Sequence, residues 1–276
     1  NDKKNYFIAE IGLNHNGSID LAKKHIEIAK ESGATVAKFQ TYFADKRAKS
    51  NSPIYEILKK CELNQDDFSY LAEFCKELDI EFASTPFCKD SFQILNELKC
   101  SFIKIASFHL TNYDLLRKIL NESNIKELII STGVSSFEDI VMTNKFYDNF
   151  ESSNKPNLTF MHCISEYPIS SINNLNLINI KEISDYTKKD VGFSDHSKGS
   201  LAPSIAISLG ARIIEKHFTI DNSLEGADHS MSANPKEFKE MVFQCNQIIN
   251  ILGRKRDYKK HFDCENNAIQ FCVKSN

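Results

Sequence analysis

Two histidines that stand at the ends of apolar, strand-like runs are the residues best suited to bind a metal ion. His196 lies just after the run 190–194, with Asp195 between them, and His217 follows the run 212–216. In a parallel α/β barrel, catalytic side chains lie at the carboxyl ends of the strands, and neutral imidazole is a common ligand of divalent transition metals. A single histidine near the core more often only completes a hydrogen bond. Two of them at matched strand ends predict a metal site.

Lysines and hydroxyl groups near the ends of the other apolar runs form a set suited to an anion. Lys38 and Lys104 each lie between apolar neighbours, as buried strand residues do, whereas most lysines extend along the surface. A phosphate or carboxylate needs positive charge and several hydrogen-bond donors aimed at its oxygens. Gly133 would also let the backbone approach such a group closely. The donors at strand ends are the hydroxyl groups of Ser84, Thr85, Ser107, Ser131, Thr132 and Ser194.

Strand-like and helix-like segments alternate along the chain, as in repeated βα units around a parallel sheet. The patterns typical of strands cover residues 6–11, 35–40, 81–85, 102–106, 127–131, 158–162, 190–194 and 212–216. Helical patterns span residues 19–32, 66–78, 91–98, 113–120, 137–150, 200–209 and 235–252, whereas residues 173–186 are weakly patterned. An open, doubly wound sheet shows the same alternation. Eight units with polar residues after every strand favour closure into an α/β fold of the (β/α)8 TIM barrel type.

Length and composition exclude several classes of protein. The 276 residues fit one large domain, because such a barrel needs about 250 residues. The formal net charge of -3 gives no electrostatic reason to expect a nucleic-acid partner. No apolar stretch reaches the length of about 20 residues that a membrane helix needs, and the amino end shows no signal peptide. The 8 cysteines are scattered without CxxC pairs, which indicates free thiols. We therefore expect a cytoplasmic protein that acts on small molecules, with no nucleic acid and no membrane among its partners.

Short motifs spread over the whole chain resemble, in the same order, those of the sialic acid synthase family, also called N-acetylneuraminate synthases. They are AEIGLNHNG at 9–17, AKFQT at 37–41, STPF at 84–87, KIAS at 104–107, STG at 131–133, His162 with Tyr167-Pro168, GFSDH at 192–196 and EKHFT at 215–219. The family includes legionaminic and pseudaminic acid synthases. Its members condense phosphoenolpyruvate with an N-acylated hexose on a (β/α)8 barrel and release phosphate. The resemblance implies the same reaction for this chain.

The resemblance also implies a role for individual residues. His196 and His217 would hold a divalent metal ion, generally Mn²⁺ or Mg²⁺. Six residues would bind phosphoenolpyruvate, namely Lys38, Thr85, Lys104, Ser107, Ser131 and Ser194. Four would contact the sugar, namely Glu10, Gln40, Tyr167 and Asp228.

The chemistry of this reaction explains why such residues are needed. Carbon 3 of phosphoenolpyruvate is a weak nucleophile, so the open-chain aldehyde of the sugar must be polarised, which a metal ion can do. Water then adds at carbon 2 with the help of a general base, and phosphate leaves. Glu10, Asp228 and His109 are the available proton handlers. His109 stands where the family typically has a glutamate, so the base or the sugar contact at this position differs.

The family resemblance also sets the expected domain boundaries. In the family, a small antifreeze-like domain follows the barrel and reaches into the partner's active site in a domain-swapped dimer. We expect residues 1–253 to form the catalytic barrel. Residues 254–276 would form the linker that leads to the antifreeze-like domain, which is absent from this sequence. A homodimer is still expected, because a second chain can pack against the barrel.

Two alternative functions remain open at this point. The first is a Schiff-base aldolase on the same barrel, in which Lys38 or Lys104 would attack a carbonyl carbon directly. The second is a non-catalytic barrel that only binds a sugar or a phosphate. Trapping with borohydride tests the first alternative, and a phosphate-release assay tests the second.

Overall fold

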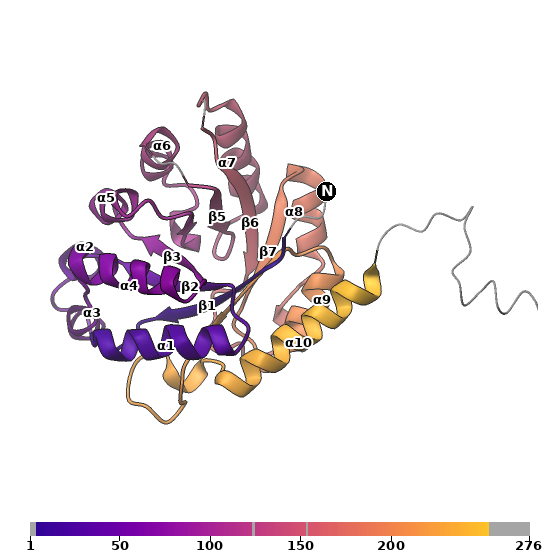
Figure 1. The fold of residues 1–276 in the computed structure, drawn as a ribbon. Coiled ribbons are helices and arrows are strands. Elements are labelled where there is room, and N and C mark those ends of the chain that lie inside the picture. Colours follow the sequence, from indigo (N-terminus) through magenta and orange to yellow (C-terminus); the bar gives the residue numbers. More distant parts are fainter. Residues whose placement is uncertain (1–3, 123–124, 153, 254–276) are drawn as a thin grey trace, which may run out of the picture.

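The structure is a computed structural model that describes residues 4–122, 125–152 and 154–253, and it contains a closed barrel of parallel strands in the order β1 to β8 (Figure 1). The strand β8 pairs with β1, which closes the barrel and confirms the expected TIM-barrel fold. Each strand end lies within one residue of the expected position. The strands are β1 (Tyr6–Gly12), β2 (Val36–Thr41), β3 (Glu81–Pro86), β4 (Phe102–Ile105), β5 (Glu127–Ser131), β6 (Asn157–Cys163), β7 (Asp190–Asp195) and β8 (Ile213–His217).

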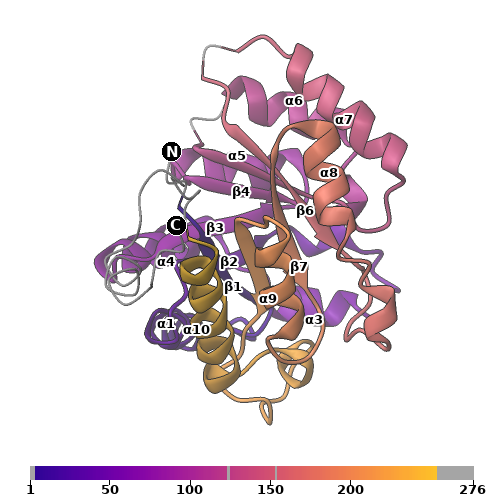
Figure 2. The same ribbon diagram turned by 90° about the vertical axis from the view of Figure 1, so that its right-hand side faces the viewer.

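Helices surround the barrel, and α10 packs on α9 beside α1 (Figure 2). The seven helices expected from sequence are present, with ends shifted by at most two residues. They are α1 (Ile19–Glu31), α4 (Gln65–Glu77), α5 (Lys89–Glu97), α6 (Tyr113–Glu122), α7 (Phe137–Asn149), α9 (Leu201–Ser208) and α10 (Pro235–Leu252). The short elements that the patterns did not predict are α2 (Ala44–Arg47), α3 (Tyr55–Lys60), α8 (Asn179–Thr187) and the 3-10 turns η1 (Ser107–His109), η2 (Ile172–Asn174) and η3 (His229–Met231).

Local capping interactions explain where several helices begin. The Asn64 side chain accepts from the backbone N–H of Asp67, and the Asp67 carboxylate accepts from the N–H of Asn64 in return. The same reciprocal capping starts α10, where Asn234 pairs with Glu237 and Pro235 occupies the first turn. Such caps satisfy backbone donors that would otherwise lack partners at a helix start.

Two apolar layers hold the barrel together. The larger layer lies between the strands and the helices. The smaller one fills the inside of the barrel, with one residue from most strands: Ile8, Val36, Ala83, Phe102, Ile129, Met161 and Ile213. This inner layer fills the barrel interior near the amino ends of the strands, and the polar side chains that follow it lie nearer the carboxyl ends.

Three further expectations concern membranes, thiols and domains. Among the described helices, not one is long and apolar enough to cross a bilayer. The described cysteines Cys61, Cys75, Cys88, Cys100, Cys163 and Cys245 are free thiols, as expected. The expected linker, residues 254–276, and the remaining cysteines Cys264 and Cys272 lie outside the described residues.

Candidate active site

The alternation of side chains along each strand puts a polar layer directly above the inner apolar layer. Side chains two residues apart on a strand point to the same face of the sheet. Glu10 therefore follows Ile8 on the inside of the barrel, and Lys38 follows Val36. The same step of two residues from the inner layer leads to Thr85, Lys104, Ser131, Cys163 and Glu215. The sequence pattern thus places the ionisable and hydroxyl groups together at one height.

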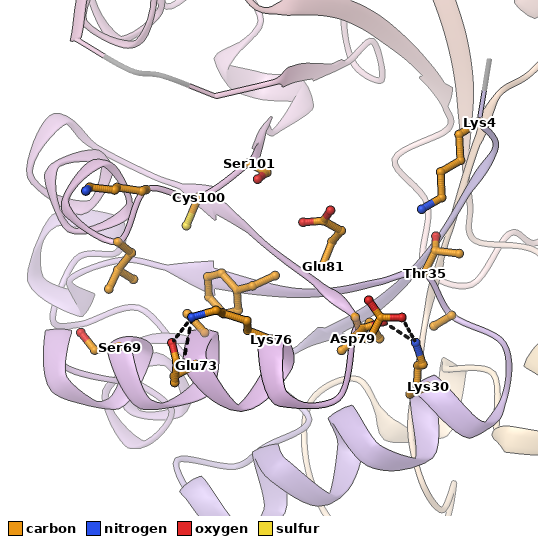
Figure 3. A pocket seen from close by; sticks show the side chains of 16 residues that line it. Lys4, Lys30, Thr35, Ser69, Glu73, Lys76, Asp79, Glu81, Cys100 and Ser101 are labelled. Atoms are coloured by element: carbon orange, nitrogen blue, oxygen red, sulfur yellow. Dashed lines mark hydrogen bonds and ion pairs between the residues drawn. The ribbon is translucent and has the colours of Figure 1, made fainter. Parts of the chain in front are cut away.

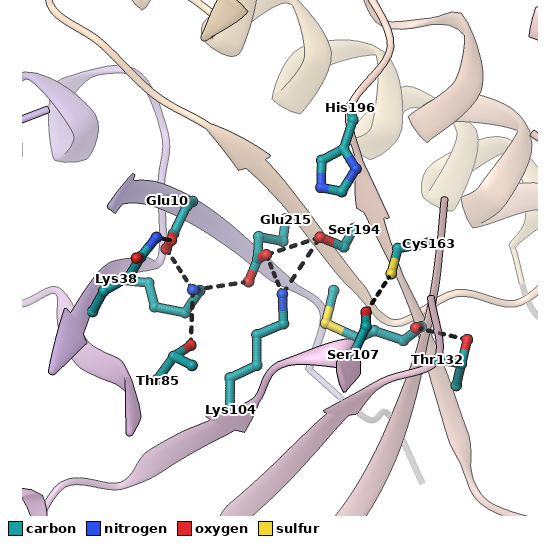
Figure 4. A network of polar contacts seen from close by, with 12 residues as sticks. Glu10, Lys38, Thr85, Lys104, Ser107, Thr132, Cys163, Ser194, His196 and Glu215 are labelled. Carbon is teal, nitrogen blue, oxygen red and sulfur yellow. Dashed lines mark hydrogen bonds and ion pairs between the residues drawn. The ribbon is translucent and has the colours of Figure 1, made fainter. Parts of the chain in front are cut away.

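A network of ion pairs connects this polar layer, with the Glu215 carboxylate between the two lysines (Figure 4). The Lys38 ammonium lies 2.5 Å from Glu10 and 3.6 Å from the second oxygen of Glu215. The Lys104 ammonium pairs with the other Glu215 oxygen, which also accepts a hydrogen bond of 2.9 Å from Ser194. Both lysine side chains are thus held in place from several directions before any ligand binds.

Burial and charge move the pKa values of the two carboxyl groups in opposite directions. Burial raises the pKa of Glu10, although the Lys38 ammonium opposes this effect. Burial would also raise the pKa of Glu215, but the charges of Lys104 and Lys38 outweigh it and lower the pKa to about 2. Burial acts to lower the pKa of Lys38, but Glu10 and Glu215 outweigh it and raise that pKa. Glu215 is therefore a fixed negative charge, whereas Glu10 is suited to exchange a proton.

Hydroxyl groups line another side of the same layer. The Thr85 hydroxyl accepts from Lys38 at 3.3 Å, and the Ser107 hydroxyl lies 3.2 Å from the Cys163 sulfur. The Ser131 hydroxyl is buried and has no hydrogen-bond partner among the residues that the structure describes. A Cβ atom at Gly133 would come within 2.6 Å of the Ser107 hydroxyl, so only glycine allows this approach. These groups provide donors that a bound anion could use.

The two predicted metal ligands lie together at the edge of this layer. The rings of His196 and His217 are 5.9 Å apart between centroids, and Tyr167 packs against His196 at 4.0 Å. Burial, together with the neighbouring His217, lowers the pKa of His196 to about 3. Burial also lowers the pKa of His217. Both imidazoles are therefore neutral near pH 7, which is the form that binds metals.

Hydrogen bonding in the histidine pair is also compatible with a metal ion. The Nδ1 of His196 lies 2.6 Å from the Ile164 carbonyl oxygen, so this nitrogen is the donor and Nε2 keeps its lone pair. The Nδ1 of His217 is buried without a hydrogen bond, 3.9 Å from the Asp228 carboxylate. Within the described residues, no group of three or more His, Cys, Asp or Glu side chains is arranged around one metal position. The pair fits a divalent ion that accepts imidazole and takes its other ligands from water and substrate.

A cavity of about 300 Å³ unites these residues at the carboxyl ends of the strands. The hydroxyl groups of Ser84 and Thr132, predicted as donors, do not line it, because they bond to Thr41 and to the Met161 carbonyl. Of the residues to which the family resemblance or the proton transfer assigned a role, all but two line it: Glu10, Lys38, Gln40, Thr85, Lys104, Ser107, Ser131, Tyr167, Ser194, His196 and His217. The two exceptions are Asp228, whose carboxylate lies 3.9 Å from the Nδ1 of His217, and His109, whose ring packs against Phe108 and Phe87.

Several residues that line the cavity were not predicted from sequence. Glu215 belongs to the motif that supplies His217, but it had no role of its own. Its position two residues before His217 on the same face could have revealed it. Arg47, Cys163 and Ser165 also line the cavity. Arg47 could not be expected, because it belongs to the unpredicted helix α2.

A larger groove of about 590 Å³ lies at the amino ends of the strands (Figure 3). Its lining includes the ion pairs of Lys30 with Asp79 and of Lys76 with Glu73. None of the predicted site residues lines this groove. In barrels of this kind the chemistry takes place at the opposite end, so the smaller cavity is the candidate active site.

Fold and cavity together define a (β/α)8-barrel protein with an anion-binding layer and a pair of neutral histidines at the carboxyl ends of its strands. Comparisons with known proteins agree. The N,N'-diacetyllegionaminic acid synthase of Campylobacter jejuni is 37% identical over 266 residues, which cover 91% of this chain and 78% of the relative. The pseudaminic acid synthase of the same species is 35% identical, with 91% of this chain and 76% of the relative covered.

A solved structure and a family model lead to the same group of proteins. The N-acetylneuraminic acid (sialic acid) synthetase of Leptospira borgpetersenii superposes with a TM-score of 0.88 at 32% identity, covering 98% of this chain and 91% of the other. The model of the NeuB family matches residues 25–257. The chain belongs to the NeuB family, which confirms the resemblance seen in its motifs.

Proposed function

We propose that this protein condenses phosphoenolpyruvate with an N-acylated hexose to give a nonulosonic acid of the sialic type and phosphate. One observation carries the proposal: a single cavity holds two fixed ammonium groups, a row of hydroxyl groups and two neutral imidazoles. An anionic donor and an aldehyde acceptor need these groups side by side. The relatives named above are synthases of legionaminic, pseudaminic and neuraminic acids.

The polar layer is the proposed binding site for phosphoenolpyruvate. Lys38 and Lys104 would neutralise its phosphate and carboxylate, and the hydroxyl groups would donate to the oxygens. The Ser131 hydroxyl has no partner in the free protein and would gain one on binding. The hydroxyl donors proposed here are Thr85, Ser107, Ser131 and Ser194.

The proposed sugar site lies beside this layer, on the side of the histidines. Gln40 donates to the Glu10 carboxylate at 2.9 Å, so both side chains are already oriented. Together with Tyr167 and Asp228 they would hold the hydroxyl and acyl groups of the open-chain hexose. Carbon 3 of phosphoenolpyruvate would then face the aldehyde carbon across the cavity.

Glu10 is the best placed of the three predicted proton handlers. It lines the cavity, and burial raises its pKa, although the Lys38 ammonium opposes this effect. As a carboxylate it would take the proton from the water that adds at carbon 2, and the adduct would then release phosphate. Asp228 and His109 are not among the lining residues: the Asp228 carboxylate lies 3.9 Å from the Nδ1 of His217, and the ring of His109 packs against Phe108. We therefore assign proton transfer to Glu10 and supporting roles to Asp228 and His109.

A divalent cation, Mn²⁺ or Mg²⁺, is proposed to bind to His196 and His217. When bound, such an ion supplies Lewis acidity that polarises the aldehyde. The imidazoles contribute by remaining neutral, and the Ile164 carbonyl holds the His196 ring in its orientation.

The geometry disfavours a Schiff-base aldolase. A lysine that attacks a carbonyl carbon must be a neutral amine, which usually requires a lowered pKa. The pKa of Lys38 is instead raised by Glu10 and Glu215, and Lys104 is paired with Glu215. Borohydride should therefore trap no covalent adduct when phosphoenolpyruvate and sugar are present.

The test of the proposed function is an assay of phosphate release. Purified protein is mixed with phosphoenolpyruvate, Mn²⁺ and a panel of N-acylated hexoses, and the products are identified by mass spectrometry. We expect phosphate release only when an acceptor is present, in equal amount to a nine-carbon or related acid. Binding of both substrates without any release would favour the non-catalytic barrel instead.

We also propose that the barrel ends near Gly253 and that the protein forms a homodimer. A version that ends at residue 253 should keep the circular dichroism spectrum and the phosphoenolpyruvate affinity of the longer chain. Light scattering of both versions measures the oligomeric state. Loss of folding in the shorter version would place the domain boundary farther along the chain.

A further inference from the structure

Arg47 contributes a cationic group to the cavity that none of the roles described above uses. It ends helix α2, just after β2, and its guanidinium lies over two aromatic rings. The ring centroid of Phe87 is 3.8 Å away, and that of Tyr42 is 4.6 Å away. Stacking of this kind fixes the plane of a guanidinium and leaves its edge free for hydrogen bonds. Arg47 belongs to the lining of the cavity.

The guanidinium of Arg47 lacks a counter-ion among the described residues. Its Nη1 atom is buried and has no hydrogen-bond partner. Its side chain also takes part in none of the ion pairs within 4.0 Å that the described residues form. Arg47 as a whole is only half-buried, but burial of even one donor of a charged group without a partner is costly, and burial lowers the pKa of Arg47. A bound carboxylate or phosphate, which arginine recognises with two parallel hydrogen bonds, would remove this cost.

The position of Arg47 assigns that anion to the sugar rather than to phosphoenolpyruvate. The lysines of the polar layer already serve the donor, and they are paired with Glu10 and Glu215. The carboxylates that act on Arg47 electrostatically are Glu10 and Asp228, both proposed to contact the sugar. Arg47 therefore faces the acceptor side of the cavity.

The neighbours of Arg47 leave room for added negative charge. Burial, and after it the charge of Arg47, lowers the pKa of His109, so that imidazole stays neutral. Phe87 and Phe108 also line the cavity and carry no charge. An uncharged hydroxyl or amide of the sugar could also bind there, but it would not compensate the buried charge.

We infer that Arg47 binds an anionic substituent, a phosphate or a carboxylate, on the N-acylated hexose, so that the preferred acceptor is an acidic sugar. This inference rests on the proposed function and names the substrate class of the same site. A charge-assisted contact of this kind corresponds to roughly a ten- to hundredfold change in kcat/KM for the acceptor.

The test compares acceptors in the phosphate-release assay. Neutral acceptors are N-acetylmannosamine and a diacetamido-trideoxy hexose. Acidic acceptors are the phosphate monoester of N-acetylmannosamine and the corresponding uronic acid. The variants are Arg47→Met, which keeps much of the stacking area, and Arg47→Lys, which keeps the charge. Lys46→Met is the matched control, because it removes a neighbouring positive charge that pairs with Asp90 on the exposed surface.

We expect the wild-type protein to use at least one acidic acceptor ten- to a hundredfold better than the neutral ones. Arg47→Met should abolish this preference with little change in KM for phosphoenolpyruvate, Arg47→Lys should restore part of it, and Lys46→Met should leave it unchanged. A wild-type preference for neutral sugars overturns the inference and leaves the proposed function intact. A rise of the phosphoenolpyruvate KM alone in Arg47→Met would assign Arg47 to the donor and overturn it as well. If no acceptor releases phosphate, the proposed function itself fails.

Discussion

Glu215→Gln is the substitution that tests the polar layer most directly, because this carboxylate touches both lysines. In the variant, Lys104 loses the carboxylate with which it pairs, whereas Lys38 keeps Glu10 at 2.5 Å. Removal of one partner from a buried ion pair costs about 3–5 kcal/mol. We take the lower end, about 3 kcal/mol, because the amide can still accept a hydrogen bond from Ser194. For a domain of this size that corresponds to a fall in Tm of about 6–12 °C.

The same substitution should strengthen the response to anions. Loss of one negative charge leaves the two ammonium groups with a single carboxylate, Glu10, so a bound phosphate gains attraction. A ligand that binds only the folded state stabilises it in proportion to the logarithm of its affinity. Phosphate or phosphoenolpyruvate at equal concentration should therefore raise the Tm of the Glu215→Gln variant by more than that of the wild type. Turnover should still fall, because Lys104 is no longer held in position.

The assay is thermal unfolding with and without inorganic phosphate, and Glu127→Gln is the matched control. Glu127 is also a buried carboxyl inside the barrel, but it lies at the amino end of β5 and is hydrogen-bonded to the Thr159 hydroxyl. Its replacement should cost only about 0.5–1.5 kcal/mol and should leave the phosphate response unchanged. Equal Tm values for wild type and Glu215→Gln, or equal phosphate responses, would refute the idea that Glu215 holds the two lysines for an anion.

Three more predictions follow from the same structure. Lys104→Met should weaken phosphoenolpyruvate binding by roughly ten- to a hundredfold in calorimetry and leave sugar binding nearly unchanged; a larger effect on the sugar would contradict the proposed pocket. His217→Gln should abolish Mn²⁺ binding in the absence of substrate. The control His162→Gln should not, because the His162 ring is hydrogen-bonded to the Leu175 carbonyl and not to the pair of His196 and His217. Retained Mn²⁺ affinity in His217→Gln would exclude the proposed metal site. Burial lowers the pKa of His15 and of His25 to about 4. Between about pH 6.5 and 4 the unfolded chain therefore binds more protons than the folded protein. As the pH is lowered through this range, the free energy of unfolding should fall by about 1.4 kcal/mol per histidine for each pH unit. Urea unfolding at several pH values measures this slope, and a His15→Gln, His25→Gln double variant with the wild-type slope would show that other groups cause it.

The fold could be predicted from sequence because its signal repeats. Each strand is a short apolar run, and each long helix shows an apolar face, so eight similar units reinforce one another. Elements that consist of one or two turns carry too few residues to show a period. Helix α2 has 4 residues and α3 has 6, and both were missed. Tertiary contacts, rather than local pattern, hold such short elements.

The site could be predicted only in part, because sequence does not show which face of a strand a residue occupies. In β8, Glu215 and His217 point into the barrel, whereas Lys216 between them pairs with Asp195 in a separate buried ion pair. Motif matching identified this segment but gave Glu215 no role. The pairing of β1 with β2 and β8 explains why Glu215 matters: its side chain points into the barrel beside that of Lys38, 3.6 Å from the ammonium. Arg47 was out of reach, since neither a motif nor a period points to it.

Carboxylates lie beside the two lysines that are proposed to bind an anion, and electrostatics explains this pairing. An ammonium buried without a partner would tend to lose its proton, so Glu10 and Glu215 keep Lys38 charged while the cavity holds no substrate. Glu215 also pairs with Lys104. Glu215 keeps its negative charge because its pKa is about 2. Glu10 has a raised pKa and can accept a proton when an anion arrives, which would free the charge of Lys38 for that anion. Glu10 would then be protonated at the stage where the aldehyde oxygen of the sugar needs a proton. Once it has given up that proton, Glu10 would be available as a base. The placement of Glu10 beside Lys38 would thus serve two purposes: it pairs with the ammonium in the free protein and transfers a proton during the reaction.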